Sequence, residues 1–334
     1  MNGSIRRFSA PRIATVAALA ASIFLFLVLG SGPASAAAGS VKEFRIPPPS
    51  TGAEGIAVGP DGAVWFTQLT TSSVGRLGTG GFSSFATPSP GYPDAIVNGP
   101  DGALWFSDLY NARISTITTS GRITEFDLPP CGSCGEYGQG ATSLALGPDG
   151  ALWFTRPAES VIGRMTTDGH VTEFTAGGPI VDPSWIANGP DGALWFTDET
   201  GIGRITTDGT ATQVWSGLNY PSAITAGPDG NLWVTGSSQD VVARVTTAGR
   251  AKLFAIHLNC DPQQIAPGAG ALWATCYNLN EIQRITTAGQ VTGFPVPGHI
   301  PNYPDVMYGI VQGPGAAMWF TEYAAGRIGR MSTA

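Results

Sequence analysis

The sequence predicts an all-β fold, a seven-bladed β-propeller with four strands in each blade. The first observation is a phrase, clearest as GPDGALWFT, that recurs seven times and carries one tryptophan per copy. The tryptophans are 40, 48, 42, 38, 40 and 46 residues apart, a period that accommodates four short strands with their turns. The second observation is that the 46 Gly and 26 Pro residues separate apolar and aromatic segments at regular intervals. The seven tryptophans are Trp65, Trp105, Trp153, Trp195, Trp233, Trp273 and Trp319.

Each repeat is expected to form four antiparallel strands. Residues 55–59 form an inner strand that ends at a Pro-Asp-Gly turn, and residues 63–67 return from it with alternating apolar side chains. The third strand carries an Ile-Gly-Arg pattern, as in residues 162–164, and a Thr-Asp-Gly turn leads to the fourth strand, as in residues 171–174. Pro and Gly then mark the crossing to the next blade.

The two ends of the repeat region complement each other. The last repeat stops after its third strand, residues 327–331, and lacks a fourth. Residues 41–44 match the fourth strand of another repeat, residues 171–174, and precede the first inner strand. We therefore expect the N- and C-terminal strands to share one blade, because closure of the ring removes exposed sheet edges.

The first 36 residues lie outside the repeats and have the order of a secretory signal. Three arginines precede an apolar stretch, residues 13–29, and small residues follow at 34–36. We predict a signal peptide over residues 1–36, a single propeller domain over residues 37–334, and a secreted or extracellular protein. The alternative is an uncleaved membrane anchor, since about 20 apolar residues span a bilayer.

Charge restricts the class of partner. Acidic residues outnumber Lys and Arg by 24 to 17, and without the three arginines of the signal segment the formal net charge falls from −7 to −10. The basic stripe that binds nucleic acid is missing from the sequence. We expect a monomer that meets a small molecule or a cell-surface partner, without nucleic acid and without membrane contact beyond the signal segment.

Four cysteines in an exported chain are expected to be oxidised, and three pairings are possible. We predict a Cys131–Cys134 bridge, which staples a Gly-rich insert, and a Cys260–Cys276 bridge, whose partners flank a predicted hairpin. A zinc site at the Cys-x-x-Cys insert would need a further pair of ligands, and the three histidines are scattered.

Two residue types recur once per blade and are expected to serve the scaffold. An arginine lies on the third strand of six blades, with Thr116 in the remaining one, and an aspartate lies in the turn of five blades. We interpret the arginines as structural ties between neighbouring blades and not as an anion-binding ring. The arginines are Arg76, Arg164, Arg204, Arg244, Arg284 and Arg330, and the aspartates are Asp61, Asp101, Asp149, Asp191 and Asp229.

A specific site must lie where the blades differ, and two positions vary. One precedes the small-apolar pair that opens each inner strand, and the other follows the tryptophan by three residues. We expect both to emerge on the same face, the one where the inner strand starts and its partner strand ends. The first set is Glu54, Asp94, Thr142, Ser184, Ser222, Gln263 and Tyr308. The second set is Gln68, Asp108, Arg156, Asp198, Gly236, Cys276 and Glu322.

The acidic members of these sets suggest a cation site. Glu54 and Asp94 occupy equivalent positions in adjacent blades, and Asp108 belongs to the second of them. With Gln68 and backbone carbonyls, these carboxylates offer the oxygen ligands that Mg²⁺ or Ca²⁺ prefers. The alternative is an acidic channel mouth without a bound metal.

Aromatic residues suggest a ligand-binding rim. Tyr92, Trp185, Tyr220 and Tyr308 are expected around the same mouth, where they would stack on an aromatic or cyclic ligand. Gln263 completes the predicted ligand-binding set.

The phrases GPDGALWFT, IGRITTDG and VTEF together resemble the streptogramin lyase (virginiamycin B lyase) family, over essentially everything after Val41. The resemblance implies a seven-bladed propeller that linearises a cyclic depsipeptide antibiotic by metal-assisted elimination. It also implies a histidine before the small-Ile pair in each of the last two blades. An acid two residues before the second histidine and an acid after the last blade's tryptophan complete the expected catalytic set.

This chain departs from that pattern. The two histidine positions hold Gln263 and Tyr308, the first acid position holds Val306, and the counterpart of the last acid is Glu322. An amide cannot abstract a proton, and a phenol with a pKa near 10 is a poor base. The general-base groups implied by the resemblance are therefore replaced.

Three histidines remain. His170 is expected in an outer turn, whereas His257 and His299 lie on crossings into the last two inner strands, near the channel mouth. If the chain is an enzyme, the catalytic candidates are Glu322, Tyr308, His257 and His299.

The sequence favours a secreted binding or recognition propeller related to the lyases. The alternative is a metal-dependent carbon–oxygen lyase that linearises a streptogramin B-type depsipeptide with rearranged catalytic groups. A lactone hydrolase on a propeller would need a cage of acids and Asn that this sequence does not assemble.

Overall fold

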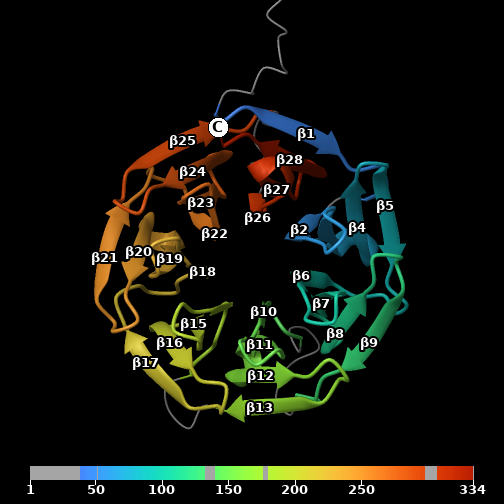
Figure 1. Cartoon of the computed structure of the whole chain (residues 1–334), viewed down its shortest axis with the longest axis horizontal. Coiled ribbons are helices and arrows are strands. Elements are labelled where there is room, and N and C mark those ends of the chain that lie inside the picture. The colour runs from blue at the N-terminus through green and yellow to red at the C-terminus, as the bar shows by residue number, and fades with distance from the viewer. Residues whose placement is uncertain (1–37, 51, 132–139, 176–179, 298–306, 334) are drawn as a thin grey trace, which may run out of the picture. The chain divides into compact units, whose positions relative to one another are not determined.

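The structure, a computed structural model, describes residues 38–50, 52–131, 140–175, 180–297 and 307–333. Residues 36–334 form one compact unit, distinct from residues 1–35. Within this unit, seven four-stranded antiparallel sheets form a ring, with one edge strand of each sheet toward the centre and the opposite edge strand on the outside (Figure 1). The predicted seven-bladed propeller is confirmed.

The strands of blades one to four follow in chain order. Blade one holds β2 (Ala53–Val58), β3 (Val64–Gln68), β4 (Ser73–Gly78) and β5 (Gly81–Ala86). Blade two holds β6 (Pro93–Asn98), β7 (Leu104–Asp108), β8 (Arg113–Ile117) and β9 (Ile123–Asp127). Blade three holds β10 (Ser143–Leu146), β11 (Leu152–Arg156), β12 (Val161–Met165) and β13 (Val171–Thr175). Blade four holds β14 (Ile186–Asn188), β15 (Leu194–Asp198), β16 (Gly201–Ile205) and β17 (Ala211–Trp215).

The remaining blades complete the ring. Blade five holds β18 (Ile224–Ala226), β19 (Leu232–Gly236), β20 (Val241–Val245) and β21 (Ala251–Ala255). Blade six holds β22 (Pro262–Gly268), β23 (Ala271–Cys276), β24 (Glu281–Ile285) and β25 (Val291–Pro295). Blade seven holds β26 (Met307–Gln312), β27 (Met318–Glu322), β28 (Arg327–Met331) and β1 (Val41–Arg45). Short 3₁₀ turns lie at Leu69–Thr71, Pro157–Glu159, Ser237–Gln239 and Pro314–Ala316. In the described part of the chain, no helix has the length and apolar character needed to cross a membrane.

The predicted closure by the two terminal strands is confirmed. Strand β1 pairs antiparallel with β28, with Val41 opposite Met331, and supplies the outer strand of blade seven (Figure 1). The Phe44 ring stacks on Trp319 at 5.6 Å between centroids, as Phe174 stacks on Trp153 at 5.3 Å in blade three. The N-terminal segment therefore replaces a fourth strand in packing as well as in hydrogen bonding.

The second strand of each blade forms the core of the ring. Trp153 and Phe154 of β11 are fully buried, and the corresponding residues of the other second strands are buried in the same way. The third strand carries glycine opposite this phenylalanine because there is no room for a side chain: a Cβ at Gly163 would lie 2.0 Å from Phe154 Cζ. The glycine of the Ile-Gly-Arg pattern is therefore required by the packing of the phenylalanine ring on the second strand.

The turn aspartates join two side chains of their own blade. Trp153 Nε1 donates to Asp149 Oδ1 at 3.0 Å, and Arg164 Nε donates to Asp149 Oδ2 at 2.6 Å. Partial burial favours a higher pKa for Asp149, but the hydrogen bonds from Arg164 and Trp153 outweigh it and lower this pKa. The expectation of ties between neighbouring blades is therefore wrong for Arg164, because its partner lies within the blade.

Blade five shows both kinds of contact. Arg244 Nη1 lies 3.7 Å from Asp229 Oδ2 of its own blade and also donates to the Thr287 carbonyl of blade six at 3.3 Å. In blade six the turn has no aspartate, so Trp273 Nε1 donates to the Gly268 carbonyl and the Arg284 guanidinium lies over the Trp273 ring. The arginines are scaffold residues, as predicted.

Threonine hydroxyls near the centre of the ring connect successive blades. Thr321 of β27 accepts the Gly309 amide at 2.8 Å and donates to the Glu54 carbonyl of blade one, also at 2.8 Å. The same donation to the next blade recurs from Thr67 to Asp94, from Thr155 to Ser184 and from Thr275 to Tyr308. These hydroxyls fix the position of inner-strand residues on which the central cavity depends.

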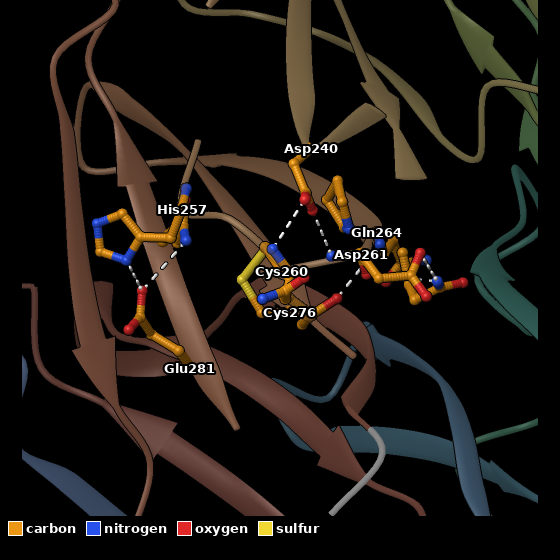
Figure 2. Close-up of a disulfide and its surroundings, with 12 residues drawn as sticks. Asp240, His257, Cys260, Asp261, Gln264, Cys276 and Glu281 are labelled. Carbon is orange, nitrogen blue, oxygen red and sulfur yellow. Dashed lines mark hydrogen bonds and ion pairs between the residues drawn. A yellow bond between two sulfur atoms is a disulfide. The ribbon is translucent and has the colours of Figure 1, made fainter. Parts of the chain in front are cut away.

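The predicted disulfide between Cys260 and Cys276 is confirmed, with Cα atoms 4.6 Å apart (Figure 2). It joins the segment before β22 to the end of β23 in blade six. The predicted Cys131–Cys134 bridge involves Cys134, which lies outside the described residues.

Replacement of Thr321 by valine keeps the side-chain shape but leaves two buried backbone groups without their partner. We expect Thr321→Val to lower the free energy of unfolding by about 2 kcal/mol, measured by urea denaturation. Thr207→Val, in an exposed outer turn, is the matched control and should leave stability within about 0.5 kcal/mol of wild type. Equal stability of the two variants would show that the inter-blade bond contributes nothing.

Candidate functional site

A cavity of about 340 Å³ lies at the centre of the ring and is lined by residues of, or adjacent to, the innermost strands. Six of the seven residues in the first variable set line it, as expected for positions that face the channel. They are Glu54, Asp94, Thr142, Ser184, Gln263 and Tyr308. The cavity is therefore the place where the otherwise repeated blades differ.

Four of these side chains come from β-bulges. In β2, β6, β22 and β26 the pairing with the second strand shifts by one residue, so that two residues oppose one. The extra residues in these blades include Glu54, Asp94, Gln263 and Tyr308. A bulge bends the strand and redirects a side chain. Blades six, seven, one and two, which are consecutive around the ring, thus present a continuous arc of bulged residues to the cavity.

The second variable set lies at the same end of the blades but not at the cavity. Gln68 pairs with Ala53, and Glu322 pairs with Met307, directly before the bulges. The described side chains of this set are buried within the blades, and none of them lines the cavity. The second set thus lies on the predicted face, where the inner strand starts and its partner ends, but its side chains do not line the cavity.

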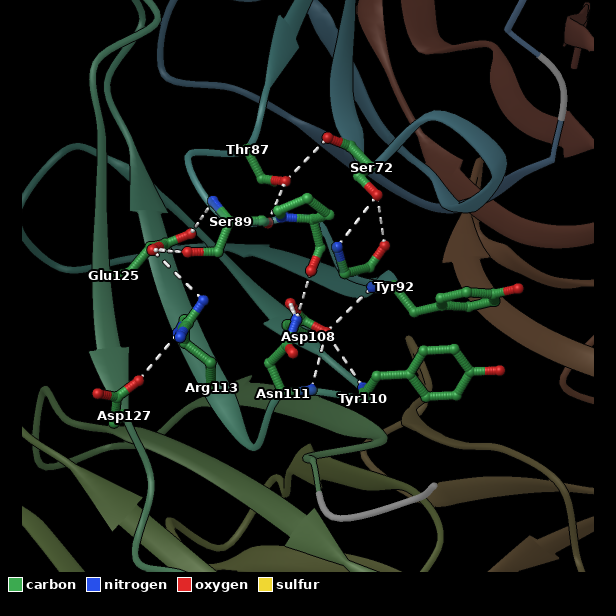
Figure 3. A network of polar contacts seen from close by, with 12 residues as sticks. Ser72, Thr87, Ser89, Tyr92, Asp108, Tyr110, Asn111, Arg113, Glu125 and Asp127 are labelled. Carbon is green, nitrogen blue, oxygen red and sulfur yellow. Dashed lines mark hydrogen bonds and ion pairs between the residues drawn. The ribbon is translucent and has the colours of Figure 1, made fainter. Parts of the chain in front are cut away.

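Asp108 illustrates this difference. Its Oδ1 accepts the amides of Tyr92, Tyr110 and Asn111, and its Oδ2 accepts Asn111 Nδ2 at 2.7 Å (Figure 3). The carboxylate organises the loops at the end of blade two, where the Tyr92 and Tyr110 rings lie side by side with centroids 3.9 Å apart (Figure 3). Of the three predicted metal ligands, Glu54 and Asp94 face the cavity and Asp108 serves the loops.

Glu322 is also placed away from the cavity. Its side chain is fully buried at the end of β27, and Arg327 Nη1 lies 3.8 Å from Glu322 Oε2. This catalytic candidate is enclosed within blade seven, whereas Tyr308 of the same blade lines the cavity.

Glu54 and Asp94 form a half-buried acidic pair in the cavity lining. Burial raises the pKa of Glu54 to about 7. Burial, together with the nearby charge of Glu54, raises the pKa of Asp94 well above its usual range. Among the described residues no Lys, Arg or His lines the cavity, so nothing there compensates a negative charge on this pair.

A group of tyrosines surrounds the acidic pair. Tyr308 packs edge-on against Tyr277 and Tyr323, with ring centroids 6.1 and 5.7 Å away. Burial, followed by the charge of Glu54, raises the pKa of Tyr308 to about 12. Burial and Glu54 also raise the pKa of Tyr323. Tyr308 is therefore a protonated hydrogen-bond donor at neutral pH.

Sequence reasoning missed Tyr277 and Tyr323. Both follow the blade tryptophan by four residues, one position after the second variable set. The repetition of Tyr at this position in the last two blades was a usable signal. Its significance depended on their packing against Tyr308, which the repeat alignment does not show.

The other predicted ligand-binding residues are divided among three places. Trp185 and Gln263 line the cavity, and Gln263 Nε2 donates to Asp261 Oδ1 at 3.0 Å. Tyr220 is 62 % exposed and donates to Glu199 Oε1 at 2.6 Å, in a surface depression beside Asp240. Tyr92 is in the loop network of blade two. The structure thus brings two of these four aromatic residues, Trp185 and Tyr308, to the cavity.

His257 lies on the outer part of blade six. Its Nδ1 is 2.7 Å from Glu281 Oε1, at the start of β24, and the side chain is 48 % exposed (Figure 2). A Cβ at Gly293 of the outermost strand would lie 2.6 Å from the His257 ring, and His257 does not line the cavity. The expectation that it lies near the channel mouth is wrong, because the crossing into β22 runs beside the outer strands. His299 lies outside the described residues.

Only part of the predicted metal-ligand set, Glu54 and Asp94, lies together at the cavity. Within the described ranges no three His, Cys, Asp or Glu side chains are grouped in a way that would hold a metal ion. Glu54 and Asp94 would supply two carboxylates; Ca²⁺ takes about six to eight oxygen ligands, whereas Mg²⁺ is often held by one or two carboxylates and keeps several waters. A Mg²⁺ or Ca²⁺ site at Glu54 and Asp94 therefore stays a prediction.

Proteins of known family share the repeats and the ring of this chain. The sequence model of the virginiamycin B lyase family matches residues 33–135 and 212–334. The chain belongs to the virginiamycin B lyase family. A search of curated protein sequences finds no significant match.

Solved structures of virginiamycin B lyases share the whole propeller. Selenomethionine-substituted virginiamycin B lyase from Staphylococcus aureus is 30 % identical, covers 88 % of this chain and 99 % of its own, and superposes with a TM-score of 0.80. A streptogramin B lyase structure is 28 % identical, with 88 % and 98 % coverage and a TM-score of 0.80. A catalytically inactive variant of the S. aureus enzyme, solved with quinupristin, is 30 % identical with 88 % and 99 % coverage and a TM-score of 0.80.

The buried Glu54 carboxyl makes stability depend on pH. Its pKa in the folded protein lies above the value of about 4.3 in an unfolded chain, so its contribution to stability is complete below about pH 4 and is lost as the pH rises through about 7. We expect wild type to lose about 3 kcal/mol relative to Glu54→Gln between about pH 4 and pH 8, measured by urea unfolding.

The matched control is Asp208→Asn. The hydrogen bond from Thr206 lowers the pKa of Asp208, so this carboxyl titrates below the range tested. A pH profile of Glu54→Gln parallel to that of wild type would show that Glu54 has an ordinary pKa.

Proposed function

We propose that this virginiamycin B lyase family member is an exported propeller that binds a small molecule in its central cavity and does not linearise it by the family's elimination. The observation that carries this proposal is the replacement of both expected histidines by Gln263 and Tyr308, two residues that line the cavity. The shared fold supports a conserved binding position, whereas the changed side chains argue against the family's proton abstraction.

The chemistry of the two replacements supports binding. The Gln263 amide has no basic atom at neutral pH. With a pKa of about 12, Tyr308 stays protonated and offers a hydrogen-bond donor to a ligand, not a base. A cavity of about 340 Å³ is at the lower end of the range found for small-molecule sites.

A second function is a carbon–oxygen lyase with rearranged groups, and one observation favours it. Glu54 lines the cavity and its pKa is about 7, which suits a general base at neutral pH. In this case Glu54 would remove the proton that a histidine removes in the family pattern. The two functions differ in whether a bound ester is broken.

Quinupristin is a direct probe, because it is the compound named in the S. aureus structure. We expect purified protein to leave quinupristin intact over a long incubation with Mg²⁺, since the family's bases are replaced. Liquid chromatography with mass spectrometry separates the intact cyclic compound from the linear product. The S. aureus lyase under the same conditions is the positive control.

Appearance of linear product would contradict the binding proposal. If Glu54→Gln then abolished that product while Asp208→Asn did not, the rearranged lyase would be supported. Persistence of activity in Glu54→Gln would exclude Glu54 as the base.

The proposal also includes export of the protein from the cell with removal of residues 1–36. The Cys260–Cys276 disulfide is typical of oxidising compartments, which agrees with a secretory signal over residues 1–36. We expect the complete chain, expressed in a secreting host, to reach the medium with an N-terminus near Ala37, determined by N-terminal sequencing. A version without residues 1–36 should stay in the cells. Recovery of the uncleaved chain in the membrane fraction would contradict cleavage.

A further inference from the structure

We propose that the central cavity binds an organic cation, a protonated or quaternary amine, between the Glu54–Asp94 pair and the aromatic rings of Tyr308 and Trp185. This inference rests on the proposed binding function and names its ligand class. It combines three independent features of the cavity: uncompensated acidity, aromatic rings and an apolar part of the lining.

The first feature is two carboxyl groups that face the cavity without a partner of opposite charge. Glu54 and Asp94 come from the bulges of adjacent inner strands, and no described residue donates a hydrogen bond to either side chain. Elsewhere in the propeller most partly buried carboxylates are paired, as Asp149 is with Arg164 and Glu173 with Arg156. A buried carboxyl pair without such a partner would be stabilised by a cationic ligand.

The second feature is the aromatic surface beside this pair. Tyr308 lines the cavity and is held by edge-on packing against Tyr277 and Tyr323. Trp185, directly before β14 of blade four, also lines the cavity, and the labelled strands of blade four (β15, β16 and β17) lie across the ring from β26 of blade seven (Figure 1). Ammonium groups are attracted to the faces of such rings, most strongly where water is excluded. The chemistry that recognises an organic cation is therefore present on two sides of the cavity.

The third feature is an apolar part of the cavity lining. Ile56, Ile96 and Ile265 line the cavity together with polar residues such as Thr142 and Ser184. An alkylammonium presents methyl and methylene groups that fit the apolar part, whereas a hard cation binds only oxygen ligands, water among them. Acid, aromatic and apolar surfaces together match an amine with a hydrocarbon body.

Protonation of the pair adds a pH dependence. The groups that face Glu54 are Asp94 of β6, Tyr308 of β26 and Tyr323 after β27, and all of them become negative on deprotonation. Because the pKa of Glu54 is about 7, a cation should bind more tightly as the pH rises through that value. Binding should release protons near neutral pH.

Choline and its uncharged carbon isostere, dimethylbutanol, test the proposal by isothermal titration calorimetry on the purified propeller. We expect choline to bind at least about tenfold more tightly than dimethylbutanol, and its affinity to rise about tenfold between about pH 6 and pH 8. Glu54→Gln with Asp94→Asn should lower choline affinity at least about tenfold and remove the pH dependence. The matched control, Asp168→Asn with Asp208→Asn, removes two exposed carboxylates from outer turns and should leave binding unchanged.

The aromatic wall has its own variants. Tyr308→Phe should keep choline binding within about threefold of wild type, whereas Tyr308→Leu should weaken it at least about fivefold. Circular dichroism and the melting temperature of each variant establish that it is folded.

Several results would overturn the inference. These are equal binding of choline and dimethylbutanol, unchanged choline affinity in the double carboxyl variant, or binding of Mg²⁺ with none of choline. If choline fails to bind while quinupristin binds intact, the ligand class is wrong and the proposed function stands. Linearisation of quinupristin would overturn the proposed function, whatever the result with choline.

Discussion

In several blades a threonine two residues after the tryptophan bonds through its hydroxyl to the inner strand of the next blade. In blade seven the bulge in β26 removes the Gly309 amide from the regular ladder, and Thr321 Oγ1 accepts that amide. The same hydroxyl donates to the Glu54 carbonyl of blade one. Since a buried amide and a buried carbonyl both need partners, one side chain satisfies the bulge and fixes the neighbouring blade. Ring closure and the location of Glu54 therefore depend on the same bond, while the Thr67 hydroxyl fixes the Asp94 carbonyl.

The rest of the propeller separates a repeated scaffold from a unique centre. The Trp–Phe stacks and the Asp149-type turns recur around the ring and keep its blades alike. The bulged arc of blades six, seven, one and two is different, because it combines an amide, a phenol and two carboxyls on one cavity wall. Function is expected at this departure from symmetry, since a residue present in every blade cannot define one orientation of a ligand.

Aligned repeats predict the features of this arrangement that depend on strand register, and they do not predict the others. Strand order, the pairing of β1 with β28 and the Cys260–Cys276 bridge depend on register, which aligned repeats reveal. The direction of a side chain at a strand end or in a crossing does not follow from register. The repeat pattern predicts Asp108, the last residue of β7, beside Glu54, but three loop amides hold its carboxylate within blade two. The His257 ring likewise contacts the Glu281 carboxylate, which lies in the outer half of the blade, and does not face the channel.

The bulges also affect which substitutions the propeller tolerates during sequence divergence. A residue in the extra position of a bulge lies outside the pairing ladder, and its side chain projects into open space, not into the core. Substitution there alters the cavity wall while the tryptophan core and the inter-blade bonds remain intact. The scaffold can therefore acquire a new ligand preference through a few exchanges at these four places, and two of them hold Gln263 and Tyr308, where the family resemblance implies histidines.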